Sequence, residues 1–161
     1  MARVPVIFAK RRLSAGQLRA VAERRFADAE CLLESGDPER ANGAIYMAGF
    51  VIGRLLKALL LERHPNLRKP VDPAKLSTSD REVFGYLYGH DLDKMLGALP
   101  ELAAKLSVVS TSEGSRVWPE FRTLCEHWTV YARYSPVSAK PTEARNFLIT
   151  VKEVKRWLKE L

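Results

Sequence analysis

The feature that most constrains the fold is a long apolar run, Ala44–Leu61, which has Arg54 and Lys57 inside it. A membrane-spanning helix needs about 20 mainly apolar residues, and a charged side chain near the centre of a bilayer is costly. We therefore expect a buried central helix of a bundle and no membrane partner. The start of the chain, where Arg11 and Arg12 follow a short apolar stretch, does not look like a secretory signal. This predicts a cytoplasmic protein.

Capping residues divide the first 63 residues into two helices. Ser14 and Gln17 fit a capping box, in which the side chain of each accepts a hydrogen bond from the other's backbone. The helix that begins there is expected to end near Ser35. The segment Gly36-Asp37-Pro38 suits a helix end followed directly by a helix start. The second helix then spans residues 38–63, and its glycines at 49 and 53 predict the close approach of another backbone.

Further helices are predicted in the second half of the chain, separated by loops at residues 65–78 and 107–116. Pro100 is expected to break one of them, and the side chain of Asp91 to cap it. The predicted helices cover residues 79–88, 91–100, 119–134 and 142–161. The sequence thus predicts an all-α protein, an up-and-down four-helix bundle with extra short helices. We expect an N-terminal arm at residues 1–13 and one bundle domain at 14–161.

Cysteine and histidine usage gives no sign of a metal or a disulfide. The 161-residue chain has two cysteines, Cys31 and Cys125, too far apart for a CxxC pair. Without a secretory signal they are expected to be free thiols in a reducing compartment. The three histidines are scattered along the sequence, which disfavours a structural zinc site. We expect neither a metal nor a cofactor.

The net charge of +7 is concentrated at the two ends of the chain. Residues 1–25 carry seven Lys or Arg and one Glu, and residues 140–161 carry six Lys or Arg and three Glu. A basic surface built from both ends would attract an acidic partner such as RNA. The alternative is an ordinary solvated surface, and the sequence leaves both open.

Four segments, in order, resemble the HEPN family of small helical proteins. They are Leu56-Lys57-Ala58-Leu59, His90-Asp91-Leu92, Trp128 to Ser135 with its Arg133-Tyr134 pair, and Phe147 to Leu158. The resemblance implies a HEPN-type bundle in a homodimer that binds RNA or a nucleotide. It also implies a role in a prokaryotic toxin–antitoxin, stress or defence system. The chain departs from the family at Gly53, where many members have a glutamate.

HEPN ribonucleases carry an arginine and a histidine separated by four to six residues, and Arg122 and His127 match a spacing of this kind. In a metal-independent endoribonuclease, His127 would transfer protons at the ribose. Arg122 would stabilise the charge that develops on the phosphoryl group. Residues five apart on a helix point about 140° away from each other, so a dimer or a helix distortion is needed. Alternatively, Arg122 forms an ion pair with Glu126, one turn later.

The resemblance also implies four candidate residues for binding a nucleotide or RNA: Arg133, Tyr134, His90 and Lys57. Arg133 and Tyr134 could meet a phosphate and a base by cation contact and stacking, or they could close the bundle. His90 could likewise make a structural hydrogen bond at a helix start. The competing hypothesis for the whole protein is a non-catalytic interaction module that partners a separately encoded nucleotidyltransferase.

Overall fold

A computed structural model describes residues 12–108 and 114–159, and these ranges contain helices and no strand. The all-α prediction is therefore confirmed. Nearly all of the predicted N-terminal arm lies outside the described residues. Of the arm's residues, only Arg12 and Leu13 are described, and Leu13 packs against the core.

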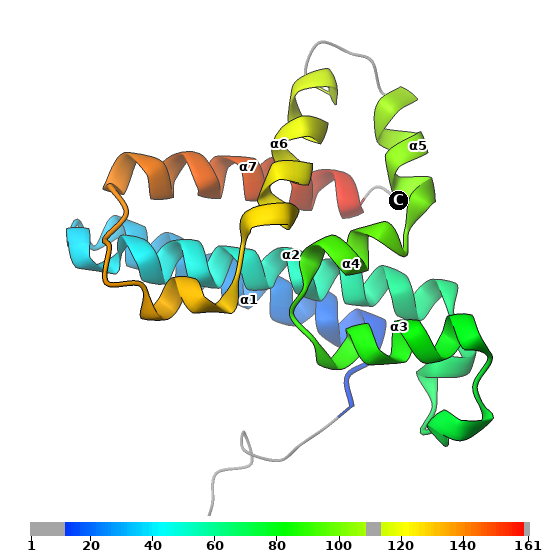
Figure 1. Ribbon diagram of the computed structural model, residues 1–161. Helices are drawn as coiled ribbons and strands as arrows, with labels where there is room; N and C mark the ends of the chain where they lie inside the picture. Colours follow the sequence, from blue (N-terminus) through cyan, green and yellow to red (C-terminus); the bar gives the residue numbers. More distant parts are fainter. Residues whose placement is uncertain (1–11, 109–113, 160–161) are drawn as a thin grey trace, which may run out of the picture.

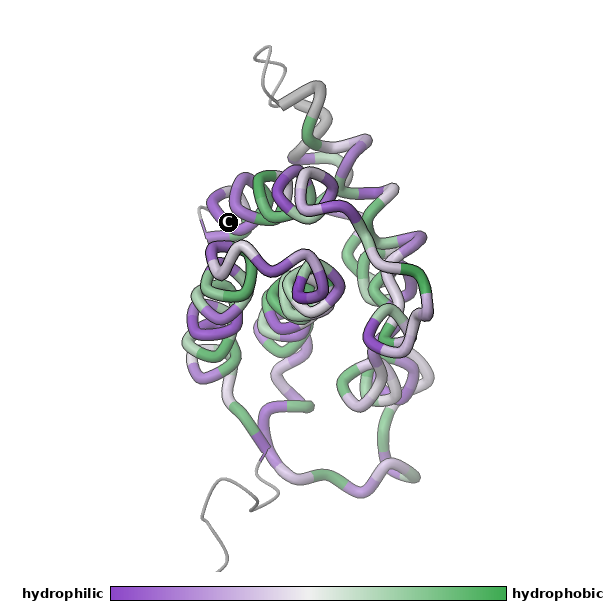
Figure 2. Tube along the Cα trace, turned by 90° about the vertical axis from the view of Figure 1, so that its left-hand side faces the viewer, coloured by the Kyte–Doolittle hydropathy of each residue, from purple (hydrophilic) through white to green (hydrophobic). Residues whose placement is uncertain are grey.

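Three long helices form the body of the protein: α1 (Ala15–Glu34), α2 (Ala41–Arg63) and α7 (Pro141–Lys159). Their axes lie nearly parallel in Figure 1, with α1 running opposite to α2 and α7. The helix α2 lies between α1 and α7 and packs against both. It also occupies the middle of the cross-section in Figure 2, which views the molecule along these axes.

The start and end of α1 follow the predicted capping chemistry. The Ser14 amide donates to Gln17 Oε1 over 2.9 Å, and the Gln17 amide donates to Ser14 Oγ over 3.2 Å. Gly36 has a φ of 71°, a backbone conformation that glycine adopts at little cost. The side chain of Asp37 then caps a short 3₁₀ turn, η2 (Pro38–Arg40), which leads into α2.

The apolar run does form the central helix. By length and composition alone, the helical segment Pro38–Arg63 could cross a membrane, because it contains a long, strongly apolar stretch. It is the one segment of this kind among the described residues. In this structure 61% of that stretch is buried inside the protein. The fully buried side chains of α2 include Val51, Ile52, Leu55, Leu56 and Leu60. Burial of each such aliphatic side chain contributes about 1.5–3 kcal/mol to folding.

Short helices occupy the middle of the chain. Between residues 65 and 78, predicted to be a loop, are two 3₁₀ turns, η3 (Pro65–Arg68) and η4 (Pro73–Lys75). Three α-helices follow: α3 (Thr78–Tyr88), α4 (Leu92–Gly97) and α5 (Pro100–Val108). Asp91 caps α4 as predicted, because its side chain accepts a hydrogen bond from the Lys94 amide over 3.0 Å. Pro100 separates α4 from α5, also as predicted.

The predicted helix at 119–134 is wrong at both ends. The helix α6 spans Gly114–His127, so Pro119 lies inside it, and the predicted loop at 107–116 is too long on both sides. After His127 the chain becomes extended at Thr129, whose side chain caps a separate 3₁₀ helix, η5 (Val130–Tyr134). Tyr131, which lies on η5, is 74% exposed.

The described parts of the two basic ends lie side by side, because α1 packs against α7. Arg19 of α1 donates to the Leu158 carbonyl of α7 over 3.3 Å. Lys155 and Lys159 of α7 form ion pairs with Glu23 of α1 at 2.6 and 2.5 Å. Part of the terminal positive charge is thus neutralised within the protein.

Gly49 and Gly53 of α2 admit side chains and not another backbone, which corrects the sequence prediction. A Cβ atom on Gly49 would fall 1.9 Å from Nε1 of Trp128. A Cβ atom on Gly53 would fall 3.3 Å from a methyl group of Leu92. These glycines therefore allow the segment after α6 and the start of α4 to pack closely on α2.

Candidate anion-binding pocket

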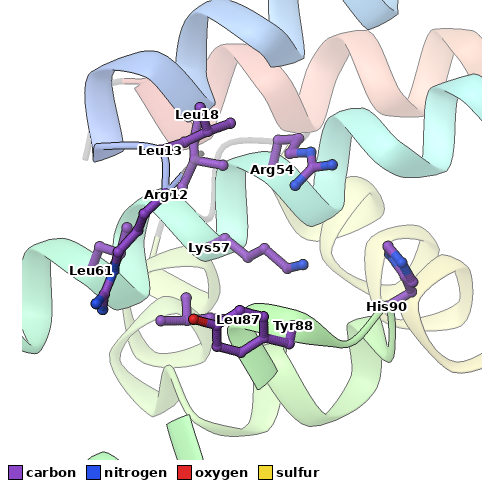
Figure 3. A pocket seen from close by; sticks show the side chains of 9 residues that line it. All are labelled: Arg12, Leu13, Leu18, Arg54, Lys57, Leu61, Leu87, Tyr88 and His90. Carbon is purple, nitrogen blue, oxygen red and sulfur yellow. The ribbon is translucent and has the colours of Figure 1, made fainter. Parts of the chain in front are cut away.

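A pocket of about 510 Å³ opens between α1, α2 and α3, near the start of the described chain (Figure 3). Its apolar wall is made by leucines from all three helices. Its polar lining consists of four basic side chains and one tyrosine: Arg12, Arg54, Lys57, His90 and Tyr88. Lys57 and His90 are two of the four predicted binding residues, and the structure brings them together here.

Lys57 is the buried cation of this pocket, with only 4% of its surface exposed. It projects from α2 toward the segment between α3 and α4 (Figure 3), where its Nζ donates to the Gly89 carbonyl over 2.7 Å. Burial, and secondarily the like charge of Arg54, lower the pKa of Lys57 to about 8. An ammonium group has three donors, so two remain for a ligand.

Arg54 extends the positive field of Lys57, and His90 adds an imidazole ring beside them. Arg54 is one helical turn before Lys57 and half-buried, and burial together with the charge of Arg25 lowers its pKa. His90 is at the pocket's edge, where burial and then the charges of Lys57 and Arg54 lower its pKa. These shifts share one physical origin, since burial and neighbouring positive charges disfavour the charged form of each group.

The mouth of the pocket is held by contacts between distant parts of the chain. The Arg12 guanidinium donates to the carbonyls of Leu67 and Lys69, in the second case over 2.6 Å. Tyr88, which is 68% exposed, packs its ring against Phe84 with a centroid distance of 5.0 Å. An arginine and an aromatic ring thus stand at the rim of a basic interior.

Among the described residues, no carboxylate lines this pocket and none pairs with Arg54 or Lys57. Elsewhere the protein does neutralise its half-buried cations: Arg19, for example, meets Glu62 at 2.8 Å. Buried charges are costly unless they are paired, and groups with perturbed pKa values gather at functional sites. The arrangement is complementary to an anion with several oxygens, such as a phosphate.

The candidate catalytic residues are not brought together within one chain. The Arg122 guanidinium is exposed and forms an ion pair with Glu126 at 3.0 Å, which was the alternative from the sequence. His127, the last residue of α6, lines a different hollow of about 530 Å³, mainly apolar, between α6, α7 and η5. Arg122 does not line that hollow.

Arg133 and Tyr134 lie on η5, away from the pocket lining. The Arg133 guanidinium carbon is 5.8 Å from the centroid of the Tyr134 ring and 5.8 Å from that of Tyr46. No described carboxylate pairs with Arg133. Tyr134 is 74% exposed, so it does not close the bundle.

Sequence reasoning missed Arg12, Arg54 and Tyr88 as parts of the site. The available signal was the pair Arg54 and Lys57, two basic residues inside an otherwise apolar helix. Arg54 counted only as evidence against a membrane span, and Lys57 was selected by the family resemblance, although unpaired charges on a core helix also indicate function. Nothing local in the sequence places Arg12 or Tyr88 beside them.

Among the described residues, no three His, Cys, Asp or Glu side chains are grouped so that they could hold a metal ion. No family model, curated protein or solved structure matches this chain.

Proposed function

We propose that the protein binds the phosphate of a nucleotide or RNA in the pocket of Arg54, Lys57 and His90. One observation supports the proposal above all: Arg54 and Lys57 are buried or half-buried on one face of α2, and no carboxylate from the described residues lines the pocket. A phosphate would supply the missing negative charge and accept hydrogen bonds from both side chains.

The ring of Tyr88 supports a nucleotide over a simple inorganic anion. It is exposed at the pocket mouth, where a base could stack on it while the phosphate lies against Lys57. Stacking of a base on an aromatic side chain contributes about 1–3 kcal/mol. The volume of about 510 Å³ falls within the range of small-molecule sites.

The test is calorimetric titration of the protein with AMP and with pyrophosphate at low salt. Lys57→Met and Arg54→Gln should each lower the affinity for both ligands by about 10-fold or more, since hydrogen bonds to charged groups contribute about 1.5–3 kcal/mol. Tyr88→Ala should weaken AMP and spare pyrophosphate. Lys152→Gln, which removes an exposed charge of α7, is the control. Binding that is absent, or unchanged in Lys57→Met and Arg54→Gln, refutes the proposal.

We assign the biological setting from the sequence resemblance, as part of the same proposal. In this proposal the protein is a HEPN-type four-helix bundle that acts as a homodimer in the cytoplasm, within a prokaryotic toxin–antitoxin or stress system. The antiparallel α1 and α2, with α7 alongside, support such a bundle. The ribonuclease hypothesis requires a second copy, because Arg122 and His127 do not converge in one chain. Partnership with a separate nucleotidyltransferase stays the alternative, and co-purification with that enzyme tests it.

A further inference from the structure

We propose that the pocket is one end of a longer track along α2, which holds a single strand of nucleic acid as far as η5. The inference rests on the proposed function, since one phosphate of the strand occupies the pocket. It adds that the ligand extends beyond one nucleotide and that Arg133 and Tyr134 contact it.

A continuous row of rings leads away from the pocket. His90, at the pocket edge, packs edge-on against Phe50 with a centroid distance of 5.2 Å. Phe50 packs against Tyr46, one turn earlier in α2, at 4.9 Å. Phe50 and Tyr46 are only partly buried. The row therefore connects the cationic pocket with the start of α2 through direct contacts.

At its far end the row meets a second cation. The Arg133 guanidinium lies between the rings of Tyr46 and Tyr134, at 5.8 Å from each centroid. Stacked guanidinium and tyrosine groups at an exposed position suit both the phosphates and the unpaired bases of a strand. In Figure 1, the segment after α6 that contains η5 lies on the same side of α2 as the turn between α3 and α4.

The length of the track sets the length of the ligand. Tyr46, Phe50, Arg54 and Lys57 are spaced by four, four and three residues, so they share one face of α2. Eleven residues of helix rise about 16 Å. At about 3.4 Å per nucleotide of a stacked strand, this corresponds to about five nucleotides. Bases in a duplex are paired and stacked on each other, so only a single strand can present base faces to these rings.

The test measures the affinity of 5′-phosphorylated oligouridylates of one, two, four and six nucleotides, with a hexamer duplex and a DNA hexamer as further arms. Affinity should rise at least 10-fold between one and four nucleotides and level off by six. Arg133→Gln and Tyr134→Ala should remove this gain and leave the mononucleotide unchanged. Tyr131→Ala is the matched control, since Tyr131 is equally exposed on η5 but is not part of the Arg133 stack.

The outcomes separate the two proposals. If the mononucleotide binds through Lys57 but length adds nothing, or the duplex binds as well as the strand, the track is refuted and the pocket proposal stands. If no phosphate ligand depends on Lys57, both are refuted. A length gain that needs Arg133 supports the track. Equal gains for RNA and DNA identify any single strand as the ligand, and a gain for RNA alone identifies RNA.

Discussion

Trp128 packs directly over Gly49, and its indole Nε1 donates to the Ile45 carbonyl over 3.3 Å. This packing joins the segment after α6 to the central helix at Gly49, where α2 has no side chain. It also fixes the start of η5, because Thr129 follows immediately. The aromatic contacts of Phe50 and Tyr46 with the same indole, at 5.4 and 6.4 Å, depend on this packing.

Gly49→Ala should therefore destabilise the protein. A Cβ atom would fall 1.9 Å from the indole, and overpacking of a core typically costs about 1–3 kcal/mol. Gly85→Ala is the matched control, because nothing lies within 4 Å of its Cβ position in α3 and alanine favours a helix over glycine. Urea denaturation should give a lower midpoint for the first variant only. Equal midpoints would show that Trp128 does not pack on Gly49.

Lys57 should make stability depend on alkaline pH. Its pKa is lowered from 10.5 to about 8 in the folded protein. Between these pH values the unfolded chain binds more protons, so the free energy of unfolding should rise with pH. At neutral pH the buried ammonium costs on the order of 3 kcal/mol.

The measurement is urea denaturation of wild type and Lys57→Met at pH 7.5, 8.5 and 9.5. The difference in stability between the two proteins should shrink as pH rises, with Lys57→Met the more stable at pH 7.5. A difference that is constant over this range would mean that the amine titrates normally.

Asp80 should make stability depend on acidic pH. The hydrogen bond from His64 Nδ1, at 2.7 Å, and that from Asn66 hold the pKa of Asp80 below its usual 3.8. A lowered carboxyl pKa stabilises the folded state fully above the unfolded value, and this contribution is lost as pH falls through the folded value. Wild type should lose stability below about pH 4 more steeply than Asp80→Asn in acid titrations followed by circular dichroism. Parallel curves would contradict this.

The two cysteines should differ in reactivity. Cys31 is exposed, whereas burial, with smaller effects of Asp93 and Glu126, raises the pKa of Cys125 well above its usual range. Because the thiolate is the reactive form, a thiol reagent should label Cys31 quickly and Cys125 only after unfolding. Peptide mass spectrometry of the labelled native protein checks this, with Cys31→Ser as the control. Fast labelling of Cys125 would mean that its part of the core opens readily.

Arg122→Ala and His127→Ala should leave the affinity for AMP within about twofold of wild type, since neither residue lines the pocket. The same variants test catalysis. If the protein is a metal-independent ribonuclease that uses Arg122 and His127, RNA cleavage should persist in excess EDTA and disappear in both variants. Cleavage unchanged by the variants would exclude this pair as the catalytic centre.

Local chemistry predicted much of the fold. Ser14, Gly36 and Asp91 act through their own neighbours in the chain, so their helix ends were predictable. The break at Thr129 was not, because it depends on Trp128 packing into the space above Gly49. Periodicity continued the helix of α6 through Tyr131, whereas tertiary contacts ended it at His127.

The site was predictable only in part, for a similar reason. Lys57 and His90 were selected by resemblance to a family, and the turn that joins α3 to α4 places them together. Arg12 reaches the same pocket through carbonyls more than fifty residues away in sequence. A pattern in one segment holds no information about such long-range contacts.

The hydrogen bond from Lys57 to the Gly89 carbonyl has a consequence for communication within the protein. The same ammonium group holds the turn between α3 and α4 and faces the pocket, so a bound anion and this carbonyl would share one cation. If an anion binds there and shifts the turn, the two equilibria are thermodynamically linked, and each changes the other by the same factor. The affinity of a protein that binds at α4 would then depend on whether the pocket is filled, even without contact with the ligand.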